Sequence, residues 1–351
     1  SLVPIVYKNQ KIYTWAKGPK GYKHNADKEI IAFNEKGDEV LHWNIPDNLS
    51  PEKFQPDFGN GYGNVEMMVL DNKIIMSWGQ WVIALNAEKS NEILWSYDAG
   101  PNKKALWTIA SKHENKVFFV VADKSHPSGD VRWPAVYGHD DIRAISLDKG
   151  EFLWKNDTWS EARTDTLFGI GQLLYHKGHL VAFVGTGGSL AADDPIWGMD
   201  KEKFAKRYMS MVSLTRANDG KPVWKSNNGG CMFKGATLSA RCYPRQWNYV
   251  AFVRDGKVYV DAKGRTMRVY DFETGVWESY SGDTKKLAES MGIPKSGNPA
   301  NNQRCGRGTG TVNYWLAGYI SWWDKDMNFE FKPVRRSGCA SQVYPAYGMT
   351  Y

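Results

Sequence analysis

Cysteine is scarce in this sequence: there are four in 351 residues, Cys231, Cys242, Cys305 and Cys339. None lies in a CxxC motif and no two are adjacent, which excludes zinc ribbons, thioredoxin-like redox sites and c-type haem attachment. An even count without metal-type spacing predicts two disulfides and a secreted or periplasm-like oxidising compartment. Three pairings are open. We expect Cys231–Cys242 and Cys305–Cys339, because each joins nearby chain; four buried free thiols are the alternative.

Long hydrophobic runs are also absent. No stretch approaches the ~18 consecutive apolar residues of a membrane-spanning helix. The opening SLVPIVYKNQ has neither a charged n-region nor an apolar h-region, so we expect that it is not a targeting peptide. The hydrophobic content of 42% is nevertheless sufficient for a sizeable core, which excludes wholesale disorder.

Charge of either sign is limited, at 24% charged residues and a net charge of +7. The basic residues are scattered, and their densest runs, 201–207 and Arg335-Arg336, are short. Nucleic-acid-binding proteins cluster their Lys and Arg on one face or helix, so we expect no nucleic-acid partner. Attraction to an acidic protein partner or an anionic surface is favoured instead.

Sequence motifs for catalysis are missing as well. No HExxH, EF-hand, P-loop or G-x-S-x-G pattern occurs, and the seven histidines are dispersed, which indicates turn or surface positions. Two short acidic clusters could offer oxygen ligands to Ca²⁺ or Mg²⁺: Asp140 and Asp141, and Asp193 and Asp194. Solvated loop carboxylates are the alternative interpretation. The sequence therefore predicts no catalytic residue, no covalent cofactor, and at most a hard cation.

Tryptophan, by contrast, is abundant, with 16 residues. Five segments repeat one pattern: an apolar strand, a polar turn that often holds Gly, and a short strand closed by Trp. They are IIAFNEKGDEVLHW (30–43), VIALNAEKSNEILW (82–95), RAISLDKGEFLW (143–154), MVSLTRANDGKPVW (211–224) and MRVYDFETGVW (267–277). The uneven spacing of the closing Trp residues indicates one repeated unit with loop insertions of different length.

A hairpin precedes each closing segment, at 4–15, 65–78, 106–121, 171–184 and 249–260. Each has two β-rich runs around a tight turn such as Asp71-Asn72 or Lys177-Gly178. Hairpin and closing segment make four antiparallel strands, and radially repeated four-stranded sheets are propeller blades. A sixth unit (311–336) and a last hairpin (341–351) follow. We therefore predict an all-β fold, a single β-propeller domain over 1–351 with seven blades; six or eight remain open.

The closing segments resemble the tryptophan-docking repeat of quinoprotein-like (pyrroloquinoline-quinone-type) β-propellers, at IALNAEKSNEILW, RAISLDKGEFLW and YDFETGVW. In that family the closing Trp packs between neighbouring blades against a Gly-containing turn. The resemblance implies this role for Gly37, Gly150, Gly220 and Gly275, and Ser90 departs from the pattern. The family includes cofactor-dependent dehydrogenases, assembly lipoproteins and scaffold subunits, so the resemblance is specific for the fold alone.

The tail from Arg304-Cys305 onward looks like the closing blade of secreted propellers of planctomycete type. Within that set, a haem-free chain of this size is similar to the propeller subunits of anammox hydrazine synthases. The resemblance implies a non-catalytic scaffold subunit of a multi-subunit redox complex, with haem-containing partner subunits and an anammoxosome-like location. Two rivals remain. One is a quinone-dependent dehydrogenase, which the missing adjacent Cys pair and the missing eighth repeat disfavour. The other is a carbohydrate-binding propeller that uses loop Trp residues.

Four loop insertions exceed what a blade connection needs: 47–64, 122–141, 186–209 and 281–303. Long loops on a rigid scaffold are where partners bind. In 186–209, Asp200 can cap a short amphipathic helix, KEKFAKRYM, preceded by a Trp. A helix folded back on its own blade is the alternative. The residues predicted to dock a partner are Trp133, Trp197, Glu202, Phe204 and Tyr208.

Overall fold

The computed structural model describes residues 5–15, 29–49, 66–101, 103–123, 138–157, 168–186, 211–227, 248–254, 256–262 and 266–278. Six short strand segments between 309 and 350 are described as well. The chain divides into two compact units, residues 1–169 with 216–221, and residues 170–215 with 222–351.

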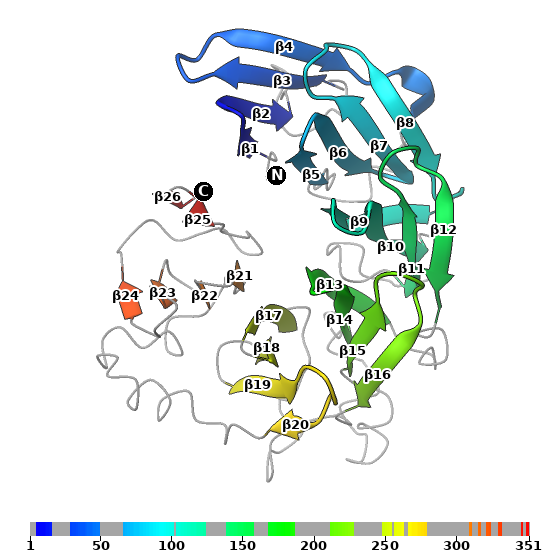
Figure 1. Cartoon of the computed structure of the whole chain (residues 1–351), viewed down its shortest axis with the longest axis vertical. Coiled ribbons are helices and arrows are strands. Elements are labelled where there is room, and N and C mark those ends of the chain that lie inside the picture. The colour runs from blue at the N-terminus through cyan, green and yellow to red at the C-terminus, as the bar shows by residue number, and fades with distance from the viewer. Residues whose placement is uncertain are drawn as a thin grey trace, which may run out of the picture. The chain divides into compact units, whose positions relative to one another are not determined.

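The described part of the first unit contains three four-stranded antiparallel sheets (Figure 1). The first sheet has β1 (Ile5–Lys8), β2 (Lys11–Trp15), β3 (Glu29–Asn34) and β4 (Glu39–Asn44), and the 3-10 helix η1 (Asp47–Leu49) follows it. The second has β5 (Glu66–Leu70), β6 (Lys73–Trp78), β7 (Trp81–Asn86) and β8 (Ile93–Asp98). The third has β9 (Lys103–Ser111), β10 (Lys116–Asp123), β11 (Gly138–Ser146) and β12 (Phe152–Asn156).

The later strands repeat the same order. The fourth sheet has β13 (Phe168–His176), β14 (His179–Thr186), β15 (Met211–Arg216) and β16 (Pro222–Asn227), and the fifth has β17 (Asn248–Arg254), β18 (Lys257–Ala262), β19 (Thr266–Asp271) and β20 (Trp277–Glu278). The sixth has β21 (Thr309–Gly310), β22 (Trp315–Leu316), β23 (Ser321–Trp323) and β24 (Phe329–Phe331), and the last hairpin has β25 (Pro345–Ala346) and β26 (Met349–Thr350).

The predicted fold class is confirmed: the chain has the all-β fold of a β-propeller, built from four-stranded blades. Six four-stranded sheets and one two-stranded sheet among the described strands match the six and a half units of the sequence. The number of blades in a closed ring and the single domain over 1–351 stay predictions. In the described part of the chain, no helix is long and apolar enough to cross a membrane.

Apolar side chains project from both faces of the second sheet, because it packs between the first sheet and the third. In β6, Ile74 and Met76 belong to the core shared with the first sheet, and Ile75 belongs to the core shared with the third. This two-sided burial explains why β6 and β7 read as continuous apolar runs rather than as an alternation. In the second unit, Val181 and Tyr270 share one further core between the fourth and fifth sheets.

Four closing tryptophans tie each sheet to the next. The indole Nε1–H of Trp95 donates to Leu147 O at 2.9 Å, that of Trp154 to Ala217 O at 3.2 Å, and that of Trp224 to Phe272 O at 2.9 Å. Trp43 donates to two carbonyls of the following sheet, Asn86 O at 3.0 Å and Lys89 O at 2.9 Å. These bonds confirm the docking role that the family resemblance implied for these four residues. The side chain of Trp277 lies outside the described residues.

Three of the predicted glycines lie against these indoles. A Cβ at Gly150 would stand 2.6 Å from the ring of Trp95, one at Gly220 2.4 Å from Trp154, and one at Gly275 2.5 Å from Trp224. Glycine is therefore required by close approach, in addition to its positive φ in each turn.

Gly37 and Ser90 depart from this arrangement. The amide of Gly37 donates to a carbonyl three residues back, whereas that of Gly150 donates four residues back, so the Gly37 turn is one residue shorter. No described atom lies within 4 Å of a Cβ placed at Gly37. The docked tryptophans each contact the turn of the following sheet, and no described sheet precedes the first one, so the predicted packing of a Trp against Gly37 stays a prediction. Ser90 accepts the amide of His42 at 3.0 Å through its hydroxyl, which gives the second sheet a different contact with the first.

Candidate functional site

Most residues that the sequence predicted for a site lie outside the described residues. This applies to the docking residues Trp133, Trp197, Glu202, Phe204 and Tyr208, to the four cysteines, and to Asp193 and Asp194. Their roles stay predictions. The described residues nevertheless contain four arrangements that bear on function.

The first arrangement surrounds Asp141, which the sequence assigned to a loop but which lies in β11 with Asp140. Its carboxylate is 5% exposed and accepts two bonds from Arg143, Nε to Oδ1 at 2.7 Å and Nη2 to Oδ2 at 3.1 Å. Burial lowers the pKa of Arg143, and the bond and charge of Asp141 outweigh it, so the net pKa is raised. Arg143 Nη1 also donates to Tyr97 Oη and Ala99 O of the second sheet.

Asp141 thus binds Arg143, whose guanidinium also contacts the second sheet. Among the described residues, no group of three or more His, Cys, Asp or Glu side chains is placed to hold a metal ion. The two predicted calcium or magnesium clusters, Asp140 with Asp141 and Asp193 with Asp194, stay predictions.

The second arrangement is the inner-strand cluster, formed by Glu66 of β5, Ser77 of β6, and Lys104 and Thr108 of β9. The Glu66 carboxyl accepts the amide of Thr108 at 2.6 Å. The residue before it, Trp107, has φ +56°, a strained value for a large side chain. Lys104 is buried, Ser77 lies beside the Glu66 carboxyl, and the hydroxyl of Thr108 has no hydrogen-bond partner among the described atoms.

Burial raises the pKa of the Glu66 carboxyl above its ordinary value. The amides of Thr108 and Trp107 and the charge of Lys104 act in the opposite direction and do not compensate. A carboxyl of this kind can hold a proton inside the protein. The sequence reasoning missed the cluster; its only local signal is charge inside apolar inner strands, at VEMMVL and KKALW.

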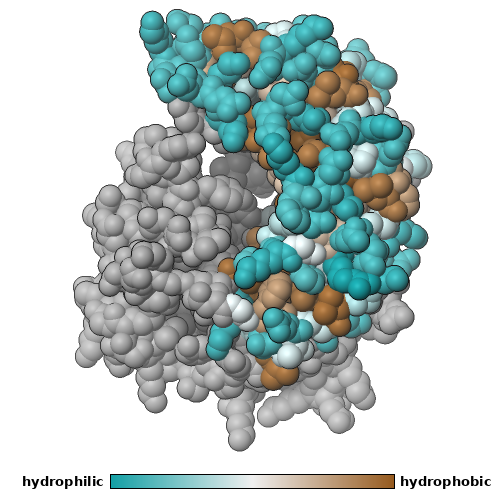
Figure 2. Space-filling model, viewed as in Figure 1, coloured by the Kyte–Doolittle hydropathy of each residue, from teal (hydrophilic) through white to brown (hydrophobic). Residues whose placement is uncertain are grey.

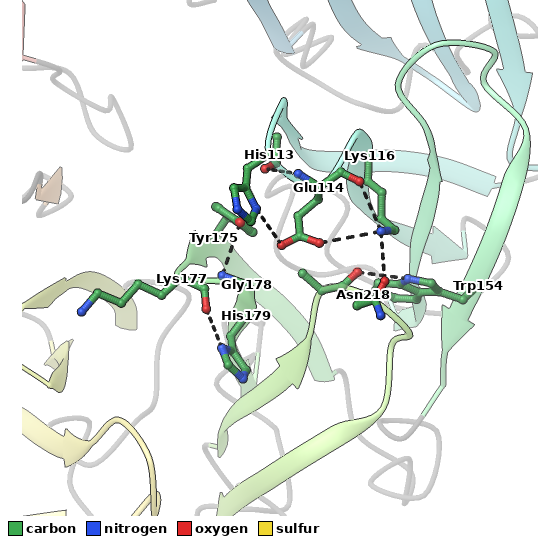
Figure 3. A network of polar contacts seen from close by, with 11 residues as sticks. His113, Glu114, Lys116, Trp154, Tyr175, Lys177, Gly178, His179 and Asn218 are labelled. Atoms are coloured by element: carbon green, nitrogen blue, oxygen red, sulfur yellow. Dashed lines mark hydrogen bonds and ion pairs between the residues drawn. The ribbon is translucent and has the colours of Figure 1, made fainter.

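The third arrangement is the turn of the β13–β14 hairpin (Figure 3). His176 and His179 flank Lys177-Gly178, and both imidazoles contact the ring of Phe272 edge to face, with centroids 5.2 and 5.7 Å apart. Burial, followed by the charges of Lys177 and His179, lowers the pKa of His176. The sequence had assigned both histidines to turn or surface positions, and it could not place Phe272 beside them.

The fourth arrangement is the apolar rim, defined as the exposed hydrophobic side chains at or beside the outermost strands: Val40, Phe152, Leu153, Val223 and Val276. Leu153, Val223 and Val276 each precede a closing Trp. Because side chains alternate between the two faces of a strand, burial of the Trp turns its neighbour outward. Figure 2 shows hydrophobic groups interrupting a mainly hydrophilic described surface.

No protein-family model and no curated protein sequence matches the chain. Among solved structures it is similar to BamB from Moraxella catarrhalis, at 11% identity and a TM-score of 0.44, over 93% of this chain and 70% of that chain. It is also similar to quinohemoprotein alcohol dehydrogenase from Comamonas testosteroni, at 13% identity and a TM-score of 0.48, over 78% of this chain but 42% of that chain.

A third similar structure is hydrazine synthase from Kuenenia stuttgartiensis, at 7% identity and a TM-score of 0.42, over 75% of this chain and 62% of that chain. The chain thus spans less than two thirds of the dehydrogenase and of the hydrazine synthase chain. Identities and scores this low bear on the fold alone and carry no argument about function.

Proposed function

We propose that this chain is a non-catalytic β-propeller scaffold subunit of a secreted or periplasmic redox enzyme complex, of the hydrazine synthase kind. It binds haem-bearing partner subunits through its loop insertions. The observation that carries the proposal is the Trp-to-turn docking, which fixes successive sheets to one another and so provides a rigid frame for long insertions.

The composition of the insertions supports docking over chemistry. The segment 186–209 combines Trp197 with the apolar face of the predicted short helix, at Phe204 and Tyr208. Buried aromatic anchors of this type carry most of the binding free energy at protein interfaces.

The net charge of +7 favours a partner surface that is acidic. The four cysteines, paired as two disulfides, fit an oxidising compartment, which is the anammoxosome if the partners are those of hydrazine synthase. The frame needs no cofactor of its own for this role.

The test is purification of the protein from its native source under non-denaturing conditions. We expect it to elute in an assembly well above its own 39.8 kDa, together with companions that show haem absorbance. Elution as a lone 39.8 kDa species would overturn the proposal.

A pair of variants locates the docking surface. Trp197→Ala with Phe204→Ala removes two predicted anchors, and loss of an anchor costs about 2 kcal/mol or more, so we expect partner affinity to fall at least ~30-fold. Phe152→Ala, a described rim residue, is the matched control for loss of exposed apolar area, and we expect a change below ~3-fold. Equal losses of partner affinity in the Trp197→Ala/Phe204→Ala variant and in Phe152→Ala would contradict docking through the insertion.

The two rival functions have their own readouts. A quinone absorbance band in the purified protein, with dye reduction on alcohols or sugars, would favour the dehydrogenase. Glycan binding that is lost in Trp133→Ala or Trp197→Ala would favour the carbohydrate-binding propeller.

A further inference from the structure

The turn between β13 and β14 places two histidines on either side of a two-residue turn. His176 is the last residue of β13 and His179 is the first of β14, and the two residues between them both have positive φ, +44° at Lys177 and +73° at Gly178. Two central residues with positive φ define a type I′ hairpin turn. The flanking residues of such a hairpin are directly opposite, with their side chains on one face and Cβ atoms about 5 Å apart.

A buried aromatic ring supports both imidazoles. Each packs edge to face on Phe272, which is 8% exposed. Phe272 is itself held by its backbone: its amide donates to Gly256 O at 2.8 Å, and its carbonyl accepts the indole of Trp224. Edge-to-face contacts orient rings, so the Phe272 ring fixes the two imidazoles on one side. On the other side both histidines remain half-exposed.

The ring nitrogens are arranged for a ligand. His179 Nδ1 lies 2.8 Å from Lys177 O, and because a carbonyl only accepts, Nδ1 carries the proton and Nε2 carries the lone pair. Metal-binding histidines commonly donate their second nitrogen to a backbone carbonyl in this way. Within the described part of the chain, no hydrogen bond occupies either ring nitrogen of His176.

We infer that His176 and His179 form a two-histidine binding site for a divalent transition-metal ion. Imidazole ligands suit Cu²⁺, Ni²⁺ and Zn²⁺, whereas Ca²⁺ and Mg²⁺ take oxygen ligands, so the site is distinct in chemistry from the acidic clusters. Cu²⁺ binds most tightly in this series. The side chain of Lys177 extends away from His179 (Figure 3). Two protein nitrogens leave the remaining metal positions to water.

The test is titration of the full-length protein with Cu²⁺ alone, followed by electron paramagnetic resonance. We expect one bound equivalent whose spectrum carries hyperfine coupling to two imidazole nitrogens. His176→Asn and His179→Asn should each weaken that equivalent at least tenfold. His113→Asn is the matched control, because His113 is a turn histidine with its side chain 87% exposed, and we expect it to leave the spectrum unchanged. Zn²⁺ should displace the copper and Ca²⁺ should not.

The same copper stoichiometry and spectrum in the wild type and in the double variant His176→Asn/His179→Asn would overturn the site. A measurement on the unmodified protein covers the case in which the variants do not fold. Copper with ascorbate oxidises the ligands of the bound ion, so peptide mass spectrometry should find oxidation at His176 and His179. Oxidation confined to other residues would also overturn the site.

Discussion

Each docking tryptophan combines two contacts of different kind at the scale of single residues. Trp154 donates its indole N–H to Ala217 O, and its ring covers the α-carbon of Gly220, where a Cβ would stand 2.4 Å away. The hydrogen bond fixes the direction of the indole, and the missing Cβ allows the ring to reach the turn. The two contacts together explain why the closing position takes Trp rather than another large apolar residue.

The glycine requirement can be separated into its two causes. Gly220→Ala adds a methyl group both to a left-handed residue and against Trp154, whereas Gly37→Ala adds one to a left-handed residue with no described neighbour within 4 Å. Left-handed alanine costs about 1–2 kcal/mol, and overpacking adds about 1–3 kcal/mol. The free energy of unfolding measured in urea should therefore fall further for Gly220→Ala than for Gly37→Ala, by about 1–3 kcal/mol. Equal losses of stability in Gly220→Ala and Gly37→Ala would mean that the Trp154 ring moves to accommodate the added methyl group at no cost.

Glu66 makes stability depend on pH in a defined direction. Its folded-state pKa is raised by burial, so its contribution is fully present below the unfolded value near 4.3 and is lost as pH rises through the folded value. Glu66→Gln removes this loss, which is about 1.4 kcal/mol for each tenfold difference in proton affinity between the folded and unfolded states. We expect the variant to gain stability relative to the wild type as pH rises in urea titrations. The exposed Glu151→Gln controls for net charge, and parallel curves for Glu66→Gln and the wild type would contradict the assignment.

At the scale of elements, neighbouring sheets are held by side chains that cross from one to the next. Arg143 of β11 binds Asp141 on its own strand and Tyr97 and Ala99 of the second sheet. Lys116 of β10 likewise reaches Asn218 Oδ1 at 3.4 Å, beside the docked Trp154 (Figure 3). These polar ties complement the apolar cores and specify which sheets lie together.

The Arg143–Asp141 pair should be strongly coupled because it is buried. Arg143→Met leaves the Asp141 carboxylate without its partner, which costs about 3–5 kcal/mol, and the double variant with Asp141→Leu should recover most of that loss. Arg216→Met is the matched control, since Arg216 binds Asp219 with the same two-bond geometry but is exposed, and its loss should stay within about 1 kcal/mol. Additive effects in the double variant would show that the buried pair is not coupled.

At the scale of the whole molecule, the chain carries a net charge of +7 on a frame of repeated sheets. The insertions differ in length and sequence, so under the proposed function we expect them to determine specificity for a partner. Charge acts at longer range than these contacts and affects how fast a partner arrives.

Association with an acidic partner should therefore depend on salt. Raising the ionic strength from about 0.05 to 0.5 M shortens the screening length from roughly 14 to 4 Å, so we expect the association rate constant to fall tenfold or more. The dissociation rate constant should change little, because it depends on the desolvated anchors. Surface plasmon resonance with the co-purified partner measures both. An association rate constant that does not change with salt would contradict electrostatic attraction between the positively charged chain and its partner.

Much of the fold was predictable because its signals are local. The Asp71-Asn72 and Lys177-Gly178 turns follow from turn chemistry, and the closing strands follow from the repeated Trp. Contacts across the sequence were not predictable. Glu66 meets Thr108 from a different sheet, and Phe272 supports two histidines from another hairpin. The shorter Gly37 turn was not predictable either, because one missing residue changes its hydrogen bonding while its composition stays the same.

The sequence by itself determined the all-β class, the four-stranded unit and the identity of the closing tryptophans, since each depends on residues close together along the chain. Only the tertiary structure decided that Asp141 pairs with Arg143, that the part-buried Glu66 meets Thr108, and that His176 and His179 both pack against Phe272. The physical reason is that burial and charge pairing depend on which sheet packs against which. That choice is made by apolar faces and docking bonds between units far apart in sequence.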